Sequence, residues 1–305
     1  MPASHPPGGR PMKLRLCDRT VCLEPGRPLL MGIVNASPES FSDGRLAGRG
    51  LEAQVAQGLE LVEAGAAILD VGGESGVTHR PPLSIAEEIR RVVPLVERLA
   101  DAGLLVSVDT YKPAVASAAL SVGASLVNDV SGLHDPALAE VCAESGAGLV
   151  VMHTRALPKQ KAFPSYADVV ADVQRFLGEQ TEAAISRGVA REQIVLDPGP
   201  DFAKTPAQTV AVLRRLGVLA SYGCPLLLAV SRKDFVGALT GRGPGARLAG
   251  TLAAIEAGVD AGATILRVHD VEAVSDFLAV RRALGGAVEV PEDLRLASEL
   301  RVEAA

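Results

Sequence analysis

The sequence predicts an α/β protein, a (β/α)₈ TIM barrel with a short N-terminal hairpin. Two features of the 305 residues support this prediction: eight short apolar runs recur along the chain, and amphipathic stretches with helical spacing fill the intervals between them. Each run is nearly continuously apolar, as parallel strands covered on both faces are. No G-x-G-x-x-G turn follows the first run, which disfavours an open dinucleotide-binding sheet.

The predicted elements follow one another in a regular order. Leu14–Leu23 alternates loosely and predicts the hairpin, and Leu51–Ala64 and Ser84–Leu99 repeat apolar residues at helical spacing. Ser84, followed three residues later by Glu87, predicts a capping box, and Gly-Ala pairs at 65–66, 123–124, 146–147 and 262–263 predict tight helix-to-strand turns. The eight predicted strands are Leu29–Asn35, Ala67–Gly73, Leu105–Thr110, Leu126–Asp129, Gly148–Thr154, Ile194–Gly199, Pro225–Ser231 and Thr264–Asp270.

The chain is expected to form one domain, because no internal stretch has the composition of a linker. Residues 1–12, rich in proline and glycine, are expected to form a flexible N-terminal tail. Residues 13–285 then form the single barrel, and residues 286–305 form a C-terminal extension.

Charge and composition argue against several classes of function. The net charge is −6, whereas a nucleic-acid-binding surface needs clustered Lys and Arg. No apolar run approaches the roughly 20 residues of a membrane span, and the N-terminus lacks the apolar segment of a signal peptide. The four cysteines show no zinc-ligand spacing, and unpaired thiols are typical of a reducing compartment. We therefore expect a cytoplasmic protein without nucleic-acid or membrane partners.

Polar residues stand where the apolar runs end. In a barrel of this type the active site is built at the C-terminal ends of the strands. Charged and amide groups are costly to bury there without partners, so their gathering around one ring predicts a pocket. Along the chain these residues are Asn35, Asp70, Glu74, Asp109, Asn128, Asp129, His153, Asp197, Ser231, Arg232, Lys233, Arg267, His269 and Asp270.

The acidic and amide side chains indicate a polar heterocycle as ligand. Asp109, Asn128 and Asp197 offer carboxylate and amide edges to a ring that presents N–H donors. Lys233 offers a cation to a carbonyl group or a ring nitrogen.

Three other strand-end residues indicate a phosphate-bearing group. Arg267 and His269 lie two residues apart on one predicted strand, so they face the same side and suit an anion. Asn35 supplies an amide oxygen to a hard cation such as Mg²⁺, which takes few protein ligands beside phosphate oxygens. The residue types thus predict a heterocycle next to a phosphate group.

Several sequence blocks resemble the signatures of the dihydropteroate synthase family. The first loop, residues 31–44, is MGIVNASPESFSDG, with Ser37 and Glu39 in place of the family's usual Thr and Asp. LDVGGES at 69–75 is similar to the second block, and the later blocks keep the family order: VSVDT at 106–110, NDVSG at 128–132, VMH at 151–153, LDPG at 196–199, VSRK at 230–233 and RVH at 267–269. The resemblance runs from about Leu14 to Leu284.

This resemblance implies a folate-biosynthesis enzyme that joins 6-hydroxymethyl-7,8-dihydropterin pyrophosphate to p-aminobenzoate on a (β/α)₈ barrel. It also implies a homodimer, for which the small-residue helix Leu248–Ala263 is the expected contact face.

The residues implied to bind the pterin are Asp109, Asn128, Asp197 and Lys233, with Met152 against its ring. Those implied to hold pyrophosphate and Mg²⁺ are Asn35, Arg267 and His269. Those implied to border the p-aminobenzoate site are Phe41, Arg80, Phe202 and Ser231. Catalysis is assigned to Asp109, Lys233, Arg267 and His269.

The chain departs from the family pattern in three places. The second loop, ESGVTHRPP at 74–82, differs from the usual Glu-Ser-Thr-Arg-Pro-Gly, which affects the second-substrate pocket most. In the sixth block Asp201 and Ala203 replace glycines, and Asp201 is expected to add a negative charge beside the pterin pocket. Asp234 follows Lys233 where serine is usual, and Ala229 replaces a glycine.

Two other functions remain open from the sequence. A pterin-binding paralogue without catalysis, or with another second substrate, would keep the pterin residues. A methyltransferase that uses a methyl-tetrahydrofolate and a corrinoid protein also has a pterin-binding barrel, but the first-loop and VSRK blocks favour the synthase. Among single residues, His153 is expected to be a core histidine and Lys204 to decorate a helix start.

Overall fold

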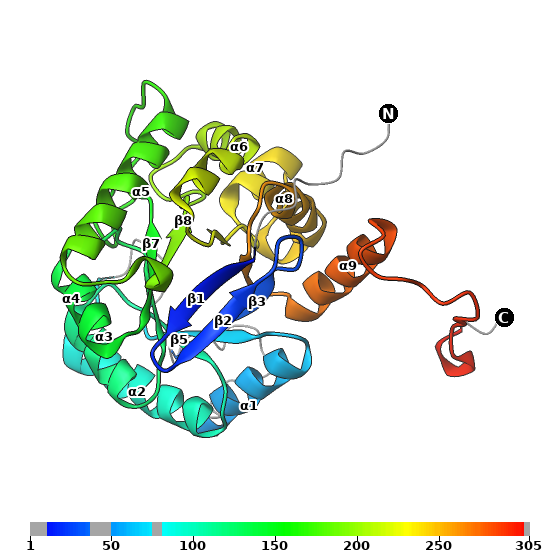
Figure 1. The fold of residues 1–305 in the computed structure, drawn as a ribbon, viewed down its shortest axis with the longest axis horizontal. Coiled ribbons are helices and arrows are strands. Elements are labelled where there is room, and N and C mark those ends of the chain that lie inside the picture. The colour runs from blue at the N-terminus through cyan, green and yellow to red at the C-terminus, as the bar shows by residue number, and fades with distance from the viewer. Residues whose placement is uncertain (1–10, 37–49, 75–80, 302–305) are drawn as a thin grey trace.

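Eight parallel strands form a nearly closed barrel with helices around it, in a computed structural model that describes residues 11–36, 50–74 and 81–301 (Figure 1). The strand order is β8-β7-β6-β5-β4-β3-β10-β9, and a parallel bridge between Leu196 and Leu226 brings the two ends of this sheet together. The predicted TIM barrel is confirmed. Its strands are β3 (Leu29–Asn35), β4 (Ile68–Gly72), β5 (Val106–Asp109), β6 (Leu126–Asp129), β7 (Gly148–Met152), β8 (Ile194–Asp197), β9 (Leu227–Leu228) and β10 (Ile265–Val268).

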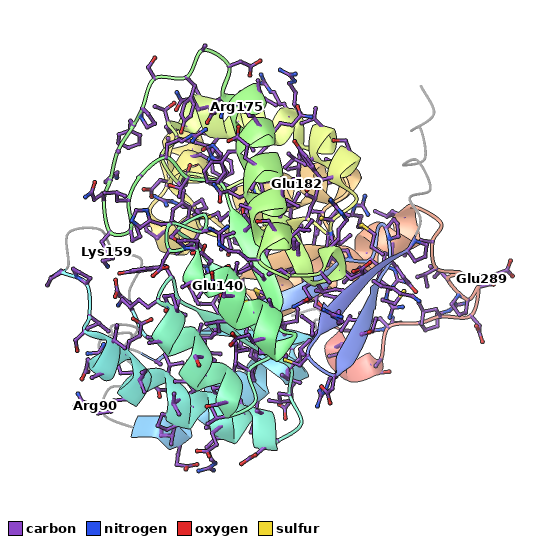
Figure 2. All side chains as sticks on the ribbon, turned by 60° about the vertical axis from the view of Figure 1, so that its left-hand side comes forward. Arg90, Glu140, Lys159, Arg175, Glu182 and Glu289 are labelled. Atoms are coloured by element: carbon purple, nitrogen blue, oxygen red, sulfur yellow. The ribbon has the colours of Figure 1, made fainter. Side chains whose placement is uncertain are left out.

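Helices follow the strands and cover the outside of the barrel. Charged side chains such as Arg175 and Glu182 lie on the outer face of α5, while its apolar side packs on the strands (Figure 2). The helices are α1 (Gly50–Glu63), α2 (Ile85–Asp101), α3 (Pro113–Ser121), α4 (Ala137–Ser145), α5 (Val169–Ser186), α6 (Pro206–Arg214), α7 (Asp234–Thr240), α8 (Leu248–Asp260) and α9 (Val271–Leu284). Short 3₁₀ turns lie at η2 (Arg191–Gln193), η3 (Leu216–Tyr222), η4 (Pro244–Ala246) and η5 (Ser298–Leu300).

The N-terminal hairpin closes the barrel at the amino ends of the strands. It pairs β1 (Met12–Leu16) with β2 (Arg19–Leu23), as the sequence predicts. Leu14, Leu16 and Leu23 are buried together with strand residues from inside the barrel, among them Ile68 and Ile265. Burying these leucines covers the apolar bottom of the barrel, so the opposite end is the one left for a site.

The predicted helix-to-strand turns are confirmed, and one of the two hydrogen bonds of the predicted capping box is present. The glycines of the four Gly-Ala pairs all have φ between +72° and +109°, a conformation that glycine adopts without steric cost. Ser84 Oγ accepts the N–H of Glu87 at 3.2 Å, but the Glu87 carboxylate pairs with Arg90 and Arg91 instead of returning to the backbone of Ser84. Ser84 therefore caps α2 without the reciprocal half of a capping box.

The seventh predicted strand is shorter than its apolar run. The run Pro225–Ser231 forms regular pairing only at Leu227–Leu228, and after the run the backbone turns at Arg232, whose φ is +58°. This turn directs the chain into α7 and places Ser231 and Lys233 at the end of the barrel that the hairpin leaves open.

Candidate active site

Strand alternation decides which strand-end residues face the barrel interior. Ile68 packs inside the barrel with the hairpin leucines and Leu69 packs outside with the helices, so Asp70 points inward again. The same alternation applies on each of the other strands. It places eight predicted site residues on the inner side: Asn35, Asp109, Asn128, Met152, Asp197, Ser231, Arg267 and His269.

Fully buried Asp70 connects neighbouring strands at the centre of this site. It accepts hydrogen bonds from Ser107 Oγ at 2.6 Å, Asn128 Nδ2 at 2.9 Å and Arg267 Nε at 2.6 Å. Arg267 Nη2 also donates to Asp109 at 2.8 Å, so its guanidinium lies between two carboxylates. Its Nη1 has no hydrogen-bond partner among the described residues. Nothing in the sequence separates Asp70 from the other strand-end carboxylates, although the two-residue alternation predicts its inward position.

Burial sets the protonation of the charged groups in the interior. Burial, opposed by Arg267 and reinforced by Asp70, raises the pKa of Asp109 to about 7. Burial also raises the pKa of Asp197, whose Oδ1 accepts the N–H of Gly199 at 2.7 Å. The same desolvation lowers the pKa of Lys233. Carboxyl groups with raised pKa values hydrogen-bond well to a neutral ring that carries N–H and NH₂ donors.

Lys233 and Phe202 meet at the edge of the interior. Lys233 Nζ lies 4.3 Å from the centre of the Phe202 ring, within the range of a cation–π contact. Lys233 precedes α7, and Phe202 belongs to the loop between β8 and α6, so two loops far apart in sequence contribute to one wall.

The two replaced glycines in that loop occupy strained backbone positions. Asp201 has φ +64° and Ala203 has φ +51°, which explains why glycine is usual at both positions. Asp201 Oδ1 accepts Thr209 Oγ1 at 3.0 Å, and its Oδ2 accepts the N–H of Phe235 at 3.0 Å. The expected extra charge therefore joins the loop to α6 and α7 instead of pointing to a ligand.

Lys204 is a structural residue that the sequence prediction misplaced. It does not decorate the start of a helix, because its side chain is only 1 % exposed. Nζ contacts His153 Nδ1 at 2.7 Å and donates to the carbonyl oxygens of Gly199 at 2.9 Å and Phe202 at 3.1 Å. An ammonium or amine end at the centre of a loop satisfies carbonyl groups that would otherwise be buried without partners.

His153 continues this chain of contacts on the outer side of β7. Its Nε2 lies 3.1 Å from Asp172 on α5, and its ring meets Phe176 edge to face at 5.0 Å. Burial and the nearby Lys204 lower the pKa of His153 to about 3, so the ring is neutral. Since Nδ1 accepts from Lys204, Nε2 carries the proton and donates to Asp172. The prediction of a core histidine is confirmed.

Ser231 and His269 form a pair on the inner side. The hydroxyl of Ser231 accepts the backbone N–H of His269 at 3.2 Å and lies 3.1 Å from its Nδ1. Desolvation and repulsion from Arg267 and Arg232 lower the pKa of His269, which makes the ring neutral and able to donate or accept a hydrogen bond. Next to this pair, Arg232 forms an ion pair with Asp270.

Two of the replacements add no charged side chain to the barrel interior. Asp234 pairs with Arg247 at 3.0 Å and not with its neighbour Lys233, because successive residues here point in different directions. Ala229 is 8 % exposed and packs with the apolar residues inside the barrel.

Two of the predicted strand-end residues, Asn35 and Met152, differ in their exposure to solvent. Asn35 is exposed at the end of β3, and its side chain has no hydrogen-bond partner among the described residues. Met152 is buried at the end of β7, level with Asp197 of β8. Within residues 11–36, 50–74 and 81–301, no three His, Cys, Asp or Glu side chains form a metal-binding group.

The second loop is described only at its two ends. Glu74 accepts Lys112 Nζ at 2.7 Å and the N–H of Leu83 at 3.0 Å, and Lys112 also contacts Glu88. Phe41 and Arg80, both predicted to border the site, lie outside the described residues, as do residues 75–80 with most of the altered loop sequence.

Comparison with known proteins agrees with this geometry. A family model described as pterin-binding enzyme matches residues 31–269. The chain is 37% identical to a dihydropteroate synthase of Escherichia coli over 278 residues, which cover 90% of this chain and 98% of that protein. It is 40% identical to the Bacillus subtilis dihydropteroate synthase over 262 residues, covering 85% and 89% of the two chains.

Solved structures show the same similarity. The Xanthomonas albilineans dihydropteroate synthase with 4-aminobenzoic acid matches with a TM-score of 0.83 and 43% identity, covering 91% of this chain and all of that one. The Burkholderia cenocepacia enzyme complexed with 7,8-dihydropteroate matches with a TM-score of 0.81 and 36% identity, covering 91% of this chain and 98% of that one. Among the described residues, no helix is long and apolar enough to span a bilayer.

Proposed function

Because this chain belongs to the pterin-binding enzymes, and within them to the dihydropteroate synthases, we propose that the open end of its barrel joins 6-hydroxymethyl-7,8-dihydropterin pyrophosphate to p-aminobenzoate. The products are 7,8-dihydropteroate and pyrophosphate. The observation that carries the proposal is the inward network of Asp70, Arg267, Asp109 and Asn128, with Asp197 on the same side.

The pterin is assigned to the acidic part of the interior. Asp109, Asn128 and Asp197 accept or donate hydrogen bonds at the edge of the ring, and Lys233 faces its carbonyl group or a ring nitrogen. Buried Met152 packs against the ring face. These groups are held by the strands and by each other, so they need little rearrangement to bind.

The leaving group is assigned to the part of the open end next to these residues, at Arg267, His269 and Asn35. Arg267 offers Nη1, and neutral His269, paired with Ser231, offers a ring N–H to a phosphate oxygen. The exposed amide of Asn35 would hold a Mg²⁺ ion together with the phosphate groups of the substrate. When bound, Mg²⁺ supplies positive charge that neutralises pyrophosphate.

The reaction is a substitution without a covalent enzyme intermediate. The carbon–oxygen bond to pyrophosphate breaks and its electron pair leaves with the oxygen, while the electron-rich dihydropterin delocalises the positive charge. The neutral amine of p-aminobenzoate then forms the new carbon–nitrogen bond and loses a proton. The carboxylates at the pterin stabilise one end of this charge separation, and Arg267 stabilises the other.

The second substrate is assigned to the wall formed by Phe202, Ser231, Phe41 and Arg80. Phe202 supplies an aromatic face beside Lys233, and Ser231 supplies a hydroxyl at the barrel edge. Phe41 and Arg80 are assigned to this wall from the family resemblance alone.

The proposal also covers the domain bounds, the oligomeric state and the cellular location of the protein. We propose that residues 13–285 form the catalytic barrel between an N-terminal tail and a C-terminal extension, and that the protein is a homodimer. Exposed Leu239 and Leu248 beside α8 support a contact there. A cytoplasmic location is supported by four free thiols, of Cys17, Cys22, Cys142 and Cys224.

Product analysis tests the proposal. The purified chain is given dihydropterin pyrophosphate and Mg²⁺, with and without p-aminobenzoate, and dihydropteroate is measured by mass. Equal amounts of dihydropteroate and pyrophosphate, formed only with p-aminobenzoate, are expected. Pterin binding without product would instead indicate the non-catalytic paralogue, and methyl transfer from a methyl-tetrahydrofolate would indicate the methyltransferase.

A further inference from the structure

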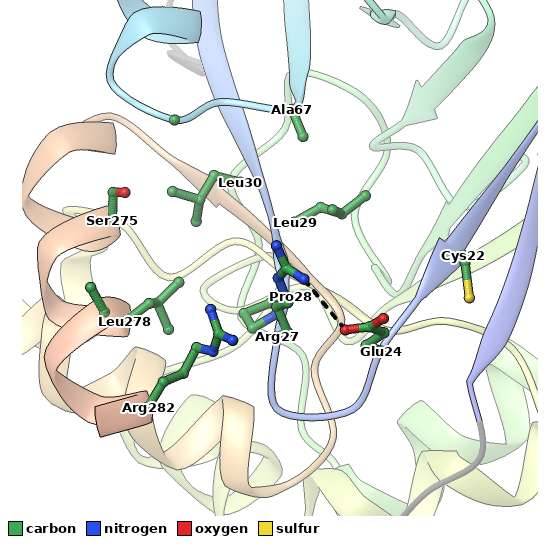
Figure 3. A pocket seen from close by; sticks show the side chains of 12 residues that line it. Cys22, Glu24, Arg27, Pro28, Leu29, Leu30, Ala67, Ser275, Leu278 and Arg282 are labelled. Carbon is green, nitrogen blue, oxygen red and sulfur yellow. Dashed lines mark ion pairs between the residues drawn. The ribbon is translucent and has the colours of Figure 1, made fainter. Parts of the chain in front are cut away.

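A cavity of about 390 Å³ lies at the amino-terminal end of the barrel, away from the active site (Figure 3). Its apolar floor includes Pro28, Leu29 and Leu278. Arg282 extends from α9 toward the turn that holds Pro28, and it has no ion-pair partner among the described residues (Figure 3). An arginine over an apolar floor suits a ligand that combines a carboxylate with aliphatic groups.

The segment after α9 carries an unusual amount of exposed apolar surface. Of the 13 large hydrophobic residues that are exposed in the described parts of the chain, five lie after the end of α9, between Val288 and Leu300. We call residues 287–301 the arm; it runs away from the barrel, and Glu289 marks it in Figure 2. Monomeric proteins rarely expose apolar surface so densely, so the arm has the character of a binding segment.

Within the described chain, the arm is joined to the rest of the molecule by hydrogen bonding only at its first residue, where the N–H of Ala287 donates to the carbonyl of Arg282. Leu294 donates to the carbonyl of Pro291 at 3.0 Å, and Arg295 donates to Glu292 and Leu294. From residue 288 onward, the hydrogen bonds found in the described chain join arm residues to one another. The arm therefore lacks the burial that would offset the loss of chain entropy on ordering.

Arm and cavity complement each other in chemistry. The carboxylates of Glu289, Glu292 and Asp293 are exposed and form no ion pair within the described residues, and leucines follow them at 294 and 296. The cavity offers Arg282 without an ion-pair partner in the described chain, the Arg27–Glu24 ion pair, and an apolar floor, so its charged lining has one positive charge in excess. A carboxylate next to leucines on one partner thus meets an arginine next to leucines on the other.

We propose that the arm of one copy of this chain seats in the cavity of a second copy, with its leucines on the floor and a carboxylate on Arg282. The arm extends away from the barrel of its own chain (Figure 1). This direction favours binding to the cavity of a second copy over binding to the cavity of the same chain. Every copy carries this arm and this cavity, so two copies exchange two identical contacts, as two-fold symmetry requires. This contact is separate from the face at α8 and does not depend on synthase activity.

Disulfide formation tests the contact, because exposed Cys22 lines the cavity. Leu294→Cys and Leu296→Cys place a thiol on the arm, and mild oxidation at micromolar concentration is followed on a non-reducing gel. A covalent dimer is expected for at least one of them. Adding Cys22→Ser should remove this band, and adding Arg282→Glu should weaken it at least tenfold.

Phe163→Cys is the matched control, since Phe163 is about as exposed as Leu296 but lies between β7 and α5, remote in sequence from the arm and the cavity. It is expected to give no Cys22-dependent dimer. A faster-moving monomer with an internal disulfide would overturn the proposal in favour of the chain's own cavity. Absence of any disulfide to Cys22 from either arm position, in folded protein with unchanged circular dichroism, would also overturn it.

Discussion

At the scale of single residues, the site depends on a carboxylate that the sequence does not distinguish. Asp70 receives donors from Ser107, Asn128 and Arg267, and it is fully buried. A buried carboxylate with three donors fixes the direction of each donor, which makes Asp70 a positioning residue for groups that meet the substrate.

Replacing Asp70 should therefore affect both stability and activity. Asp70→Asn keeps the shape but removes a charge next to Arg267, with an expected loss of about 2 kcal/mol in the free energy of unfolding. Activity, measured as kcat/KM for the pterin substrate, should fall at least tenfold. Ser107→Ala is the control, because it removes one donor to the same carboxylate and leaves the ion pairs intact. Equal stability and equal kcat/KM in the two variants would contradict the positioning role.

The backbone conformation of Ala203 should lower the stability of the protein. Its φ of +51° is costly for a side chain with a Cβ atom. Ala203→Gly should raise the free energy of unfolding by about 1 kcal/mol, measured by urea denaturation. Ala56→Gly, at an exposed position inside α1, should lower it by about 1 kcal/mol. Two changes of the same sign would show that the left-handed conformation at Ala203 carries no strain.

At the scale of elements, the loop between β8 and α6 is built around Lys204. Its Nζ joins His153 and the carbonyls of Gly199 and Phe202, so the loop that presents Phe202 to Lys233 is held from inside. A long cationic side chain is usually found at the surface, so residue type alone predicts the opposite placement.

The buried Lys204 predicts a pH dependence of stability. Burial lowers its pKa to about 7, whereas the unfolded chain keeps a lysine pKa of about 10.4. Between these values the unfolded chain binds more protons, so folding becomes more favourable as the pH rises. The free energy of unfolding of the wild type, minus that of Lys204→Met, should increase from pH 7 to pH 10 by up to about 1.4 kcal/mol per pH unit. A difference that stays constant over this range would mean that Lys204 is charged in the folded protein.

The strands could be predicted from the sequence where the local pattern of apolar residues determines their bounds. The runs Leu29–Asn35 and Leu126–Asp129 are strands with the predicted bounds, because an apolar run between turn residues specifies a buried strand by itself. Pro225–Ser231 is an equally apolar run, yet only Leu227–Leu228 pairs regularly, and the turn that follows at Arg232 is held by contacts with Thr251 of α8 and Asp270 before α9. Likewise, alternation predicts that Arg267 faces inward, but its placement between Asp70 and Asp109 depends on three strands together.

At the scale of the whole molecule, the two ends of the barrel have opposite characters. The hairpin leucines fill the amino-terminal end with apolar side chains, and the inner strand ends place carboxylates, amides and cations at the other. The central claim is that this polar end, assembled from strands distant in sequence, carries the synthase reaction.

Lys233 tests that claim most directly, because it belongs to the site through its position beside Phe202 and Asp197. The measurement is the rate of p-aminobenzoate-dependent pyrophosphate release by Lys233→Ala, compared with Lys13→Ala on the hairpin at the far end. We predict a fall of at least about 100-fold for Lys233→Ala, since it removes a preorganised charge from the site, and no change for Lys13→Ala. A rate for Lys233→Ala close to that of the wild type would contradict the account.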